Sequence, residues 1–271
     1  MKSAMKISRE SSILVLALGP LQLLVLCGFL FPGLARGGDW PMWRHDAGRG
    51  AATSETLEDD LSLQWSRQLH RPRPAWPDSQ YKLQFDASYE PIVMGQTLYV
   101  GSMVSDSVTA YDTGSGREKW RFYADGPVRF APVGYQGKLY FASDDGYLYC
   151  LNAENGSVAG KFLGGPGQNK ILGNDRLIGM WPVRGGPVER GGKIYFAAGI
   201  WPFMGTFIHA IDAGSGKAVW SNSGSGSTFL MQPHSSPAFA GVAPQGYMVA
   251  AQDKLLVSGG RSVPAAYDGV T

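Results

Sequence analysis

The chain has 271 residues and a formal net charge of +2, with 37 glycines, 17 prolines, 8 tryptophans, 12 tyrosines and 12 phenylalanines. The small charge excludes a strongly basic nucleic-acid binder, and the many aromatic residues exclude a disordered chain. Two cysteines exclude a disulfide scaffold. High glycine with high aromatic content favours many short strands joined by tight turns.

The first 35 residues have the layout of a secretory signal peptide. Basic residues precede an apolar stretch from Ile13 to Leu30, and small residues Gly33 and Ala35 stand at the −3 and −1 positions of a cleavage site. We therefore expect cleavage after Ala35 and export to the periplasm or the extracellular space. The alternative is an uncleaved anchor, since Ile13–Leu34 is just long enough to span a membrane.

A motif with a small residue, an Asp or Asn, a glycine and a tryptophan recurs through the rest of the chain. The Asp or Asn side chain can accept backbone N–H groups of the following turn, and the glycine supplies the positive φ that closes it. The tryptophan follows on the next strand, where its ring can lie over the neighbouring repeat. The copies are Ala110, Asp112, Gly116, Trp120; Cys150, Asn152, Gly156, with Gly160 in place of tryptophan; Ala210, Asp212, Gly216, Trp220; and Ala266, Asp268, where the chain stops at Thr271.

Matching strands precede each copy of this motif. Those directly before it are expected at 97–101, 138–142, 193–197 and 254–258, and a further set upstream at 90–93, 131–133, 186–188 and 247–249. Four short antiparallel strands repeating every ~40 residues are typical of a propeller blade. The sequence predicts an all-β propeller with four-stranded antiparallel blades at about 88–122, 129–162, 184–222 and 245–271. We expect the last blade to be truncated and the ring incomplete, as in a fragment of a larger propeller.

The motif resembles the tryptophan-docking motif of the pyrroloquinoline-quinone-type β-propellers, and the resemblance covers residues 39–271. Members of that family include quinoprotein dehydrogenases, an outer-membrane assembly scaffold and secreted proteins of unassigned function. The resemblance implies that residues 36–87 lead into the propeller. It also implies that a strand near Leu61–Arg67 supplies the outermost strand of the last blade.

The family's enzymes imply a bound quinone, calcium, an aspartate base and a vicinal cysteine pair. The only cysteines here are Cys27 and Cys150, so that pair is absent. We expect no cofactor and no catalytic residue, with pyrroloquinoline quinone and calcium as the alternative. Ser143–Gly146 is predicted to be a hairpin turn rather than a calcium loop. His209 is predicted to be packed or to face the propeller axis.

Two arginines are candidate binding residues. Arg129 and Arg184 each stand at the start of a predicted innermost strand, where side chains line the central funnel of a propeller. The alternative is that both are solvated loop arginines. Long glycine-rich connections at 163–183 and 221–244 have the composition of recognition loops.

The sequence thus predicts an exported, non-catalytic binding or scaffolding module of the cell envelope. Its partner would be a protein or another envelope ligand and not nucleic acid. Membrane contact would come only through an uncleaved N-terminal segment. The alternatives are a fragment of a quinone-dependent dehydrogenase, and a carbohydrate-binding or sensor propeller.

Overall fold

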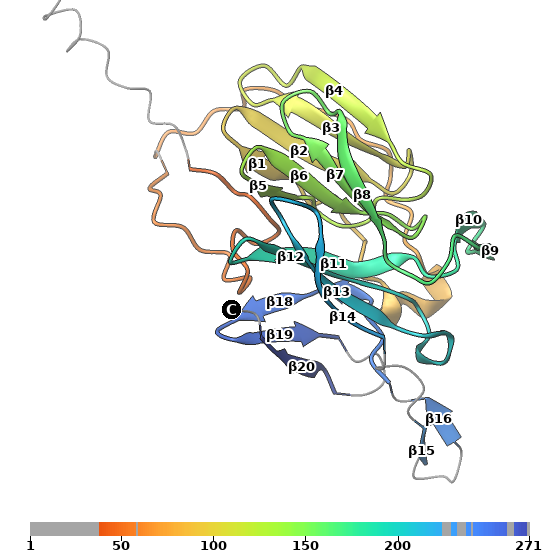
Figure 1. Ribbon diagram of the computed structural model, residues 1–271. Coiled ribbons are helices and arrows are strands. Elements are labelled where there is room, and N and C mark those ends of the chain that lie inside the picture. The colour runs from red at the N-terminus through yellow and green to blue at the C-terminus, as the bar shows by residue number, and fades with distance from the viewer. Residues whose placement is uncertain are drawn as a thin grey trace, which may run out of the picture. The chain divides into compact units, whose positions relative to one another are not determined.

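The computed structural model describes residues 38–57, 59–223, 229–231, 237–239, 241–258 and 263–269. The predicted signal peptide lies outside the described residues. Three mainly antiparallel sheets of four strands or more and one of three follow one another along the chain (Figure 1). The predicted all-β class and the antiparallel blade pattern are confirmed.

The strands of each sheet follow one another in the order of the sequence. The first sheet holds β1 (Ile92–Met94), β2 (Thr97–Ser102), β3 (Ser107–Asp112) and β4 (Glu118–Tyr123). The second holds β5 (Val133–Tyr135), β6 (Lys138–Ala142), β7 (Tyr147–Asn152) and β8 (Val158–Leu163). The third holds β11 (Val183–Arg190), β12 (Lys193–Ala198), β13 (Phe207–Asp212) and β14 (Ala218–Asn222). The fourth holds β18 (Val249–Ala251), β19 (Lys254–Val257) and β20 (Ala265–Asp268).

The remaining elements are short. β17 (Gly246–Tyr247) adds to the third sheet by pairing in parallel with β11. Two separate hairpins are formed by β9 (Lys170–Gly173) with β10 (Arg176–Gly179), and by β15 (Phe229–Met231) with β16 (Pro237–Phe239). Two 3-10 helices, Asp78–Leu83 and Pro202–Met204, lie in connections. No helix among the described residues is long and apolar enough to cross a membrane.

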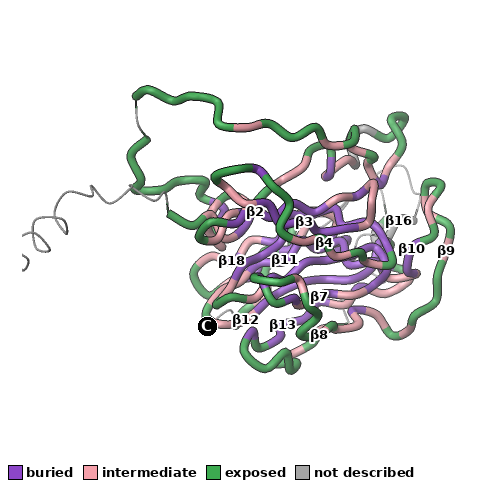
Figure 2. Tube along the Cα trace, turned by 90° about the horizontal axis from the view of Figure 1, so that it is seen from above, coloured by how far each residue is buried: buried purple, intermediate pink, exposed green. Residues whose placement is uncertain are grey.

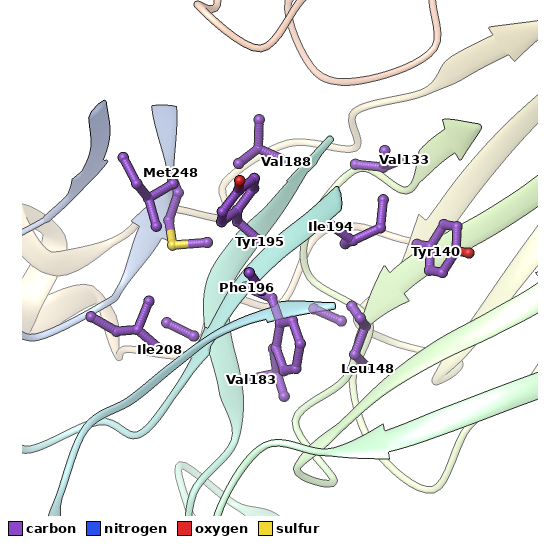
Figure 3. Close-up of a cluster of buried hydrophobic side chains, with 14 of the residues drawn as sticks. Val133, Tyr140, Leu148, Val183, Val188, Ile194, Tyr195, Phe196, Ile208 and Met248 are labelled. Carbon is purple, nitrogen blue, oxygen red and sulfur yellow. The ribbon is translucent and has the colours of Figure 1, made fainter. Parts of the chain in front are cut away.

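The middle strands are apolar on both faces because sheets cover them on both sides. In β6, Leu139 and Phe141 belong to the hydrophobic core shared with the first sheet, whereas the alternate residues Tyr140 and Ala142 pack toward the third. Successive side chains of a strand point to opposite faces, so a strand between two sheets loses the polar alternation of a solvent-facing one. Figure 3 shows Tyr140 and Leu148 beside Ile194 and Phe196 of β12.

Burial falls from the middle strands to the last strand of each sheet. The side chains of β12 are almost entirely buried, while those of β4 alternate between exposed and half-buried (Figure 2). The last strand of a sheet therefore has one solvent-exposed face. The tryptophan of the repeat motif lies on its other, half-buried face.

The turns of the repeat motif share one geometry. Asp112 Oδ1 accepts hydrogen bonds from Ser115 N (2.8 Å) and Ser115 Oγ (2.7 Å), and Asp212 makes the same pair with Ser215. Asn152 Oδ1 accepts from Glu154 N at 2.8 Å. The closing glycines lie at φ +64° (Gly116), +73° (Gly156) and +70° (Gly216). This left-handed conformation favours glycine because it has no Cβ.

Tryptophan rings lie over two of these turns. Trp120 covers Gly156, and its Nε1 donates to the Ala153 carbonyl at 3.1 Å. Trp65 covers Gly116, and its Nε1 donates to the Thr113 carbonyl at 2.7 Å. Trp220 packs beside Tyr195 with ring centroids 6.2 Å apart.

The strand expected at Leu61–Arg67 stays a prediction: within the described chain these residues form no strand. A strand requires a neighbour that takes its backbone hydrogen bonds, and no described segment pairs with this one. The segment instead runs exposed along the first sheet. It is attached through Trp65 and through Arg67, whose Nε donates to the Gly116 carbonyl at 2.7 Å.

The segment 39–50 contacts the first strands of all four sheets. Trp40 forms an antiparallel bridge with Val93, and the Pro41 carbonyl accepts from Gly134 N at 2.7 Å. Further along, the Ala47 carbonyl accepts from Ala250 N at 2.9 Å. Arg49 completes the set by donating to the carbonyls of Trp43 (2.9 Å), Pro187 (2.9 Å) and Met248 (3.1 Å).

Candidate binding site

Arg129 and Arg184 meet at one carboxylate. Arg129 lies in the loop before β5 and Arg184 lies on β11, and Asp144 stands between them in the turn from β6 to β7. Arg129 Nε is 2.7 Å from Asp144 Oδ2. Arg184 Nε and Nη2 donate to Asp144 Oδ1 (3.1 Å) and Oδ2 (3.0 Å). The turn predicted at Ser143–Gly146 is confirmed, with Gly146 N donating to the Ser143 carbonyl.

A second carboxylate completes this arginine–aspartate cluster, which comprises Arg129, Arg184, Asp86 and Asp144. Asp86 Oδ2 lies 2.5 Å from Arg129 Nη1 and accepts from Ala75 N at 3.0 Å. The four side chains are at most 4% exposed. Two guanidinium groups thus face two carboxylates, and the cluster is neutral as a whole. Neither arginine is a solvated loop side chain.

The charges within the cluster control its ionisation. Burial alone would raise the pKa of Asp144, but the guanidinium groups of Arg129 and Arg184 hold it below its ordinary value. Burial likewise opposes the charge of Arg129, yet Asp144 and Asp86 raise its pKa. Asp144 and Arg129 are therefore charged at neutral pH, because each has an opposite charge in direct contact.

Arg184 also lines a cavity of about 360 Å³. One wall comes from the β9–β10 hairpin, and another from Trp76 and Trp201, whose rings meet at 69° with centroids 5.4 Å apart. This Arg184 cavity has the make-up of a ligand site, with apolar and aromatic walls and few polar groups. The residues around it are Ala75, Trp76, Pro77, Gln80, Ile171, Leu172, Gly173, Asn174, Ile178, Arg184, Ile200 and Trp201.

Several contacts fix the walls of the Arg184 cavity. Trp76 Nε1 donates to Gln245 Oε1 at 2.9 Å. The β9–β10 hairpin is attached to the first sheet by Arg176, whose Nη2 contacts Asp106 Oδ1 at 2.6 Å. Trp201 remains 41% exposed at the rim. These contacts hold the walls of the cavity in place. A partner can reach the aromatic side chain at its rim.

The carboxylates around Arg184 make contacts within the protein. Both carboxylates near Arg184 are already bound by arginines, and Asp145 accepts from Tyr147 N at 2.9 Å and from Tyr149 Oη at 2.5 Å. No group of three or more histidine, cysteine, aspartate or glutamate side chains suited to a metal occurs in the described part of the chain.

His209 is packed, as one of its two predicted placements requires. Nδ1 is 2.8 Å from Ser221 Oγ and Nε2 is 2.7 Å from the Gly164 carbonyl. Its ring lies against Phe162 and Phe196. Burial lowers its pKa, so the imidazole is neutral at physiological pH.

A second group of interacting polar side chains, Arg49, Glu90 and Tyr247, was not predicted from the sequence. Burial lowers the pKa of Arg49 to about 10 and raises that of Glu90. The Tyr247 hydroxyl donates a hydrogen bond to Glu90, and the Tyr247 ring stacks on the Trp43 ring with centroids 3.9 Å apart. No sequence signal links these residues, because up to about two hundred positions separate them.

Comparisons with known proteins agree with the fold. The family model described as outer membrane protein assembly factor BamB matches residues 41–241. No curated protein matches the sequence.

Solved structures give the same picture at low sequence identity. Quinohemoprotein alcohol dehydrogenase from Comamonas testosteroni is similar over 85% of this chain and 36% of its own, with 19% identity and a TM-score of 0.52. A europium-containing methanol dehydrogenase is similar over 82% and 43%, with 15% identity and a TM-score of 0.51. BamB from Moraxella catarrhalis is similar over 68% and 56%, with 12% identity and a TM-score of 0.48.

The chain thus spans between about a third and just over half of the length of these structures. The likeness to the two dehydrogenases shows the fold alone. The family model covers well over half of the chain, on the residues that form the first three sheets and the segment leading into them. The chain belongs to the family of pyrroloquinoline-quinone-type β-propellers whose family model is described as outer membrane protein assembly factor BamB.

Proposed function

We propose that this protein is an exported, non-catalytic binding propeller of the cell envelope, with a protein partner that docks at the Arg184 cavity. The observation that carries the proposal is the arginine–aspartate cluster, in which two guanidinium groups are balanced by two carboxylates. Its carboxylates are bound by arginines and its guanidinium groups are held in place, so it supports a rigid surface and offers no free base.

The family supports the same proposal. Its model is named after an outer-membrane protein assembly factor, which is a role in protein assembly rather than in turnover of a substrate. The rim of the cavity adds Trp201 and Leu172, which are 41% and 78% exposed. Exposed tryptophan beside apolar residues is typical of the energetically dominant part of a protein interface.

Reconstitution with a quinone tests this proposal against its enzyme alternative, a fragment of a quinone-dependent dehydrogenase. The full chain is titrated with pyrroloquinoline quinone and calcium, and dye reduction is followed with alcohols and sugars. We expect neither saturable quinone binding nor substrate-dependent dye reduction. Stoichiometric binding with turnover would overturn the non-catalytic role.

A carbohydrate ligand is the second candidate, and one observation favours it. Trp76 and Trp201 stand together at the edge of the cavity, and the apolar face of a sugar packs well on an indole. A glycan array separates the two: a defined glycan whose binding is lost in Trp201→Ala supports a carbohydrate module. Absence of any Trp201-dependent signal leaves the protein partner as the ligand class.

A further inference from the structure

The turn of the third repeat lacks the ring that covers the other two. Cβ atoms built on Gly116 and Gly156 would lie 2.5 Å from Trp65 and 2.7 Å from Trp120, which measures how closely each indole sits on its glycine. A Cβ built on Gly216 would meet no atom within 4 Å. The three glycines have nearly the same φ, so the turn itself is equally formed.

The missing ring is explained by one residue of β8. Cys150 pairs with Gly160 in the second sheet as Ala110 pairs with Trp120 in the first. Gly160 has no side chain, and a Cβ on it would also meet no atom within 4 Å. The position that would supply the third indole is therefore empty.

A cavity of about 170 Å³ lies where that indole would be. It is bounded on one side by Gly160 and Phe162 of β8, and on the other by Gly216 and its turn. Cys150, a partly exposed thiol, also lines it. We call this cavity the vacant slot.

Lys138 takes over the hydrogen bond that an indole makes in the filled slots. The Ala153 carbonyl accepts from Tyr99 Oη (2.9 Å) and from Trp120 Nε1. At the vacant slot the Ala213 carbonyl accepts from Tyr140 Oη and from Lys138 Nζ, the latter at 3.1 Å. The turn thus keeps its shape without a ring, and an ammonium group stands at the edge of the slot.

The chemistry of the slot selects an indole. A flat ring fits the space above Gly216, where a Cβ is absent, just as rings fit above the two equivalent glycines. The ammonium of Lys138 is attracted to the face of an aromatic ring, and tryptophan is the best partner for such a cation–π contact. An aliphatic side chain would gain only the burial.

The protein also shows how an indole reaches such a slot from outside a sheet. Trp65 belongs to a segment that forms no strand, yet its ring is seated on Gly116 and Arg67 adds a backbone contact beside it. An extended segment that pairs with no described strand can therefore deliver the ring. β8 is the last strand of its sheet, so the approach along it is open in the described part of the chain.

We propose that the vacant slot binds the tryptophan side chain of an extended segment in a partner polypeptide. The site is separate from the Arg184 cavity. It rests on the proposed function only in that the partner is a protein, and the test below uses neither a quinone nor the envelope.

Protection of Cys150 from alkylation tests the slot on the full chain carrying Cys27→Ser, so that one thiol remains. Burial raises the pKa of Cys150, so labelling is done at alkaline pH. The probe is a peptide with the sequence of residues 61–67, and we expect saturable, several-fold slower alkylation of Cys150. The same peptide with alanine in place of its tryptophan should not protect.

Two controls decide the assignment. Gly160→Trp supplies the ring from the protein itself, so alkylation should be slow without peptide and insensitive to it; Gly160→Leu is a smaller filling variant if the first does not fold. Equal alkylation of wild-type protein with and without the peptide overturns the site. Protection by free indole as tight as by the peptide overturns the polypeptide source and leaves a small-molecule ligand.

Discussion

Asp144 is the residue on which the binding region depends most. It is buried, it receives three arginine N–H groups, and it stands in a turn whose backbone contacts the loops before β5 and β11. Losing a buried charge partner is far more damaging than losing an exposed one, because the remaining charges stay desolvated.

Asp144→Asn should therefore reduce the free energy of unfolding by about 3–5 kcal/mol, since Arg129 and Arg184 would remain buried and the remaining carboxylate, Asp86, contacts only Arg129 of the two. The matched control is Asp175→Asn. Asp175 faces Arg73 at 3.6 Å with both side chains more than half exposed, and its loss should change stability by less than about 1 kcal/mol. Urea denaturation measures both, and equal losses would contradict this account of the cluster.

The acid limb of the stability curve should report the same residue. The folded-state pKa of Asp144 lies below its unfolded value, so its contribution is complete above the ordinary aspartate pKa of about 3.9. It is lost as pH falls through the folded-state pKa. We expect Asp144→Asn to fall less steeply with acid than wild type when unfolding free energies are measured across this range. Parallel curves would assign the acid sensitivity to other carboxylates.

At the scale of elements, the repeat turns are distinguished by whether a ring covers them. Gly116, Gly156 and Gly216 share one backbone conformation, but only the first two lie under an indole. The same substitution at the three positions thus separates backbone strain from steric overlap.

Gly216→Ala should cost about 1 kcal/mol, the penalty for a Cβ at positive φ. Gly116→Ala and Gly156→Ala should lose a further ~1–3 kcal/mol, because the new methyl group displaces Trp65 or Trp120. Thermal and urea unfolding of the three variants compare them directly. Losses of the same size at all three positions would show that the rings yield without penalty.

Segment 39–50 is an irregular segment that crosses the first strands of the four sheets and contacts each of them. Arg49 fastens it by donating to three backbone carbonyls of different segments. Its pKa of about 10 leaves it charged at physiological pH, which strengthens each hydrogen bond.

Arg49→Ala should destabilise the protein by about 3 kcal/mol or more, because three backbone carbonyls, two of them in buried hydrogen bonds, lose their donor. Arg44→Ala is the control: the Arg44 side chain is exposed and its guanidinium lies over the Trp43 ring at 5.0 Å, so we expect a change below about 1 kcal/mol. Hydrogen exchange at Ala250 N, which donates to this segment, should accelerate only in Arg49→Ala. Unchanged exchange at Ala250 N would show that segment 39–50 stays bound to the sheets without the Arg49 side chain.

For the molecule as a whole, the sequence predicted what depends on local pattern. The motif around Asp112 and Asp212 predicts the turns, because the hydrogen-bond donors and the acceptor lie within three residues of each other. The apolar runs around Tyr140 and Tyr195 predict the buried strands. Pairings over long distances could not be read in this way. Asp144 lies 40 positions from Arg184, and Arg49 lies 199 from Met248.

The strand predicted at residues 61–67 depends in the same way on a partner elsewhere. The segment alternates like a strand, but whether it pairs depends on a neighbour that its own residues do not specify. What anchors it, Trp65 on Gly116, uses the same contact that the repeats use.

The central claim is that a protein partner binds at the Arg184 cavity. Site-specific photo-crosslinking in the envelope of the native cells tests it most directly, with a photoreactive residue at Trp201 on the rim and, as control, at Tyr123 on β4, which is 65% exposed and does not line the cavity. We predict a discrete protein adduct from position 201 that Leu172→Arg, an exposed change on the same rim, reduces several-fold, and no such adduct from position 123. Equal adducts from both positions, or an adduct from position 201 that Leu172→Arg leaves unchanged, would contradict the claim.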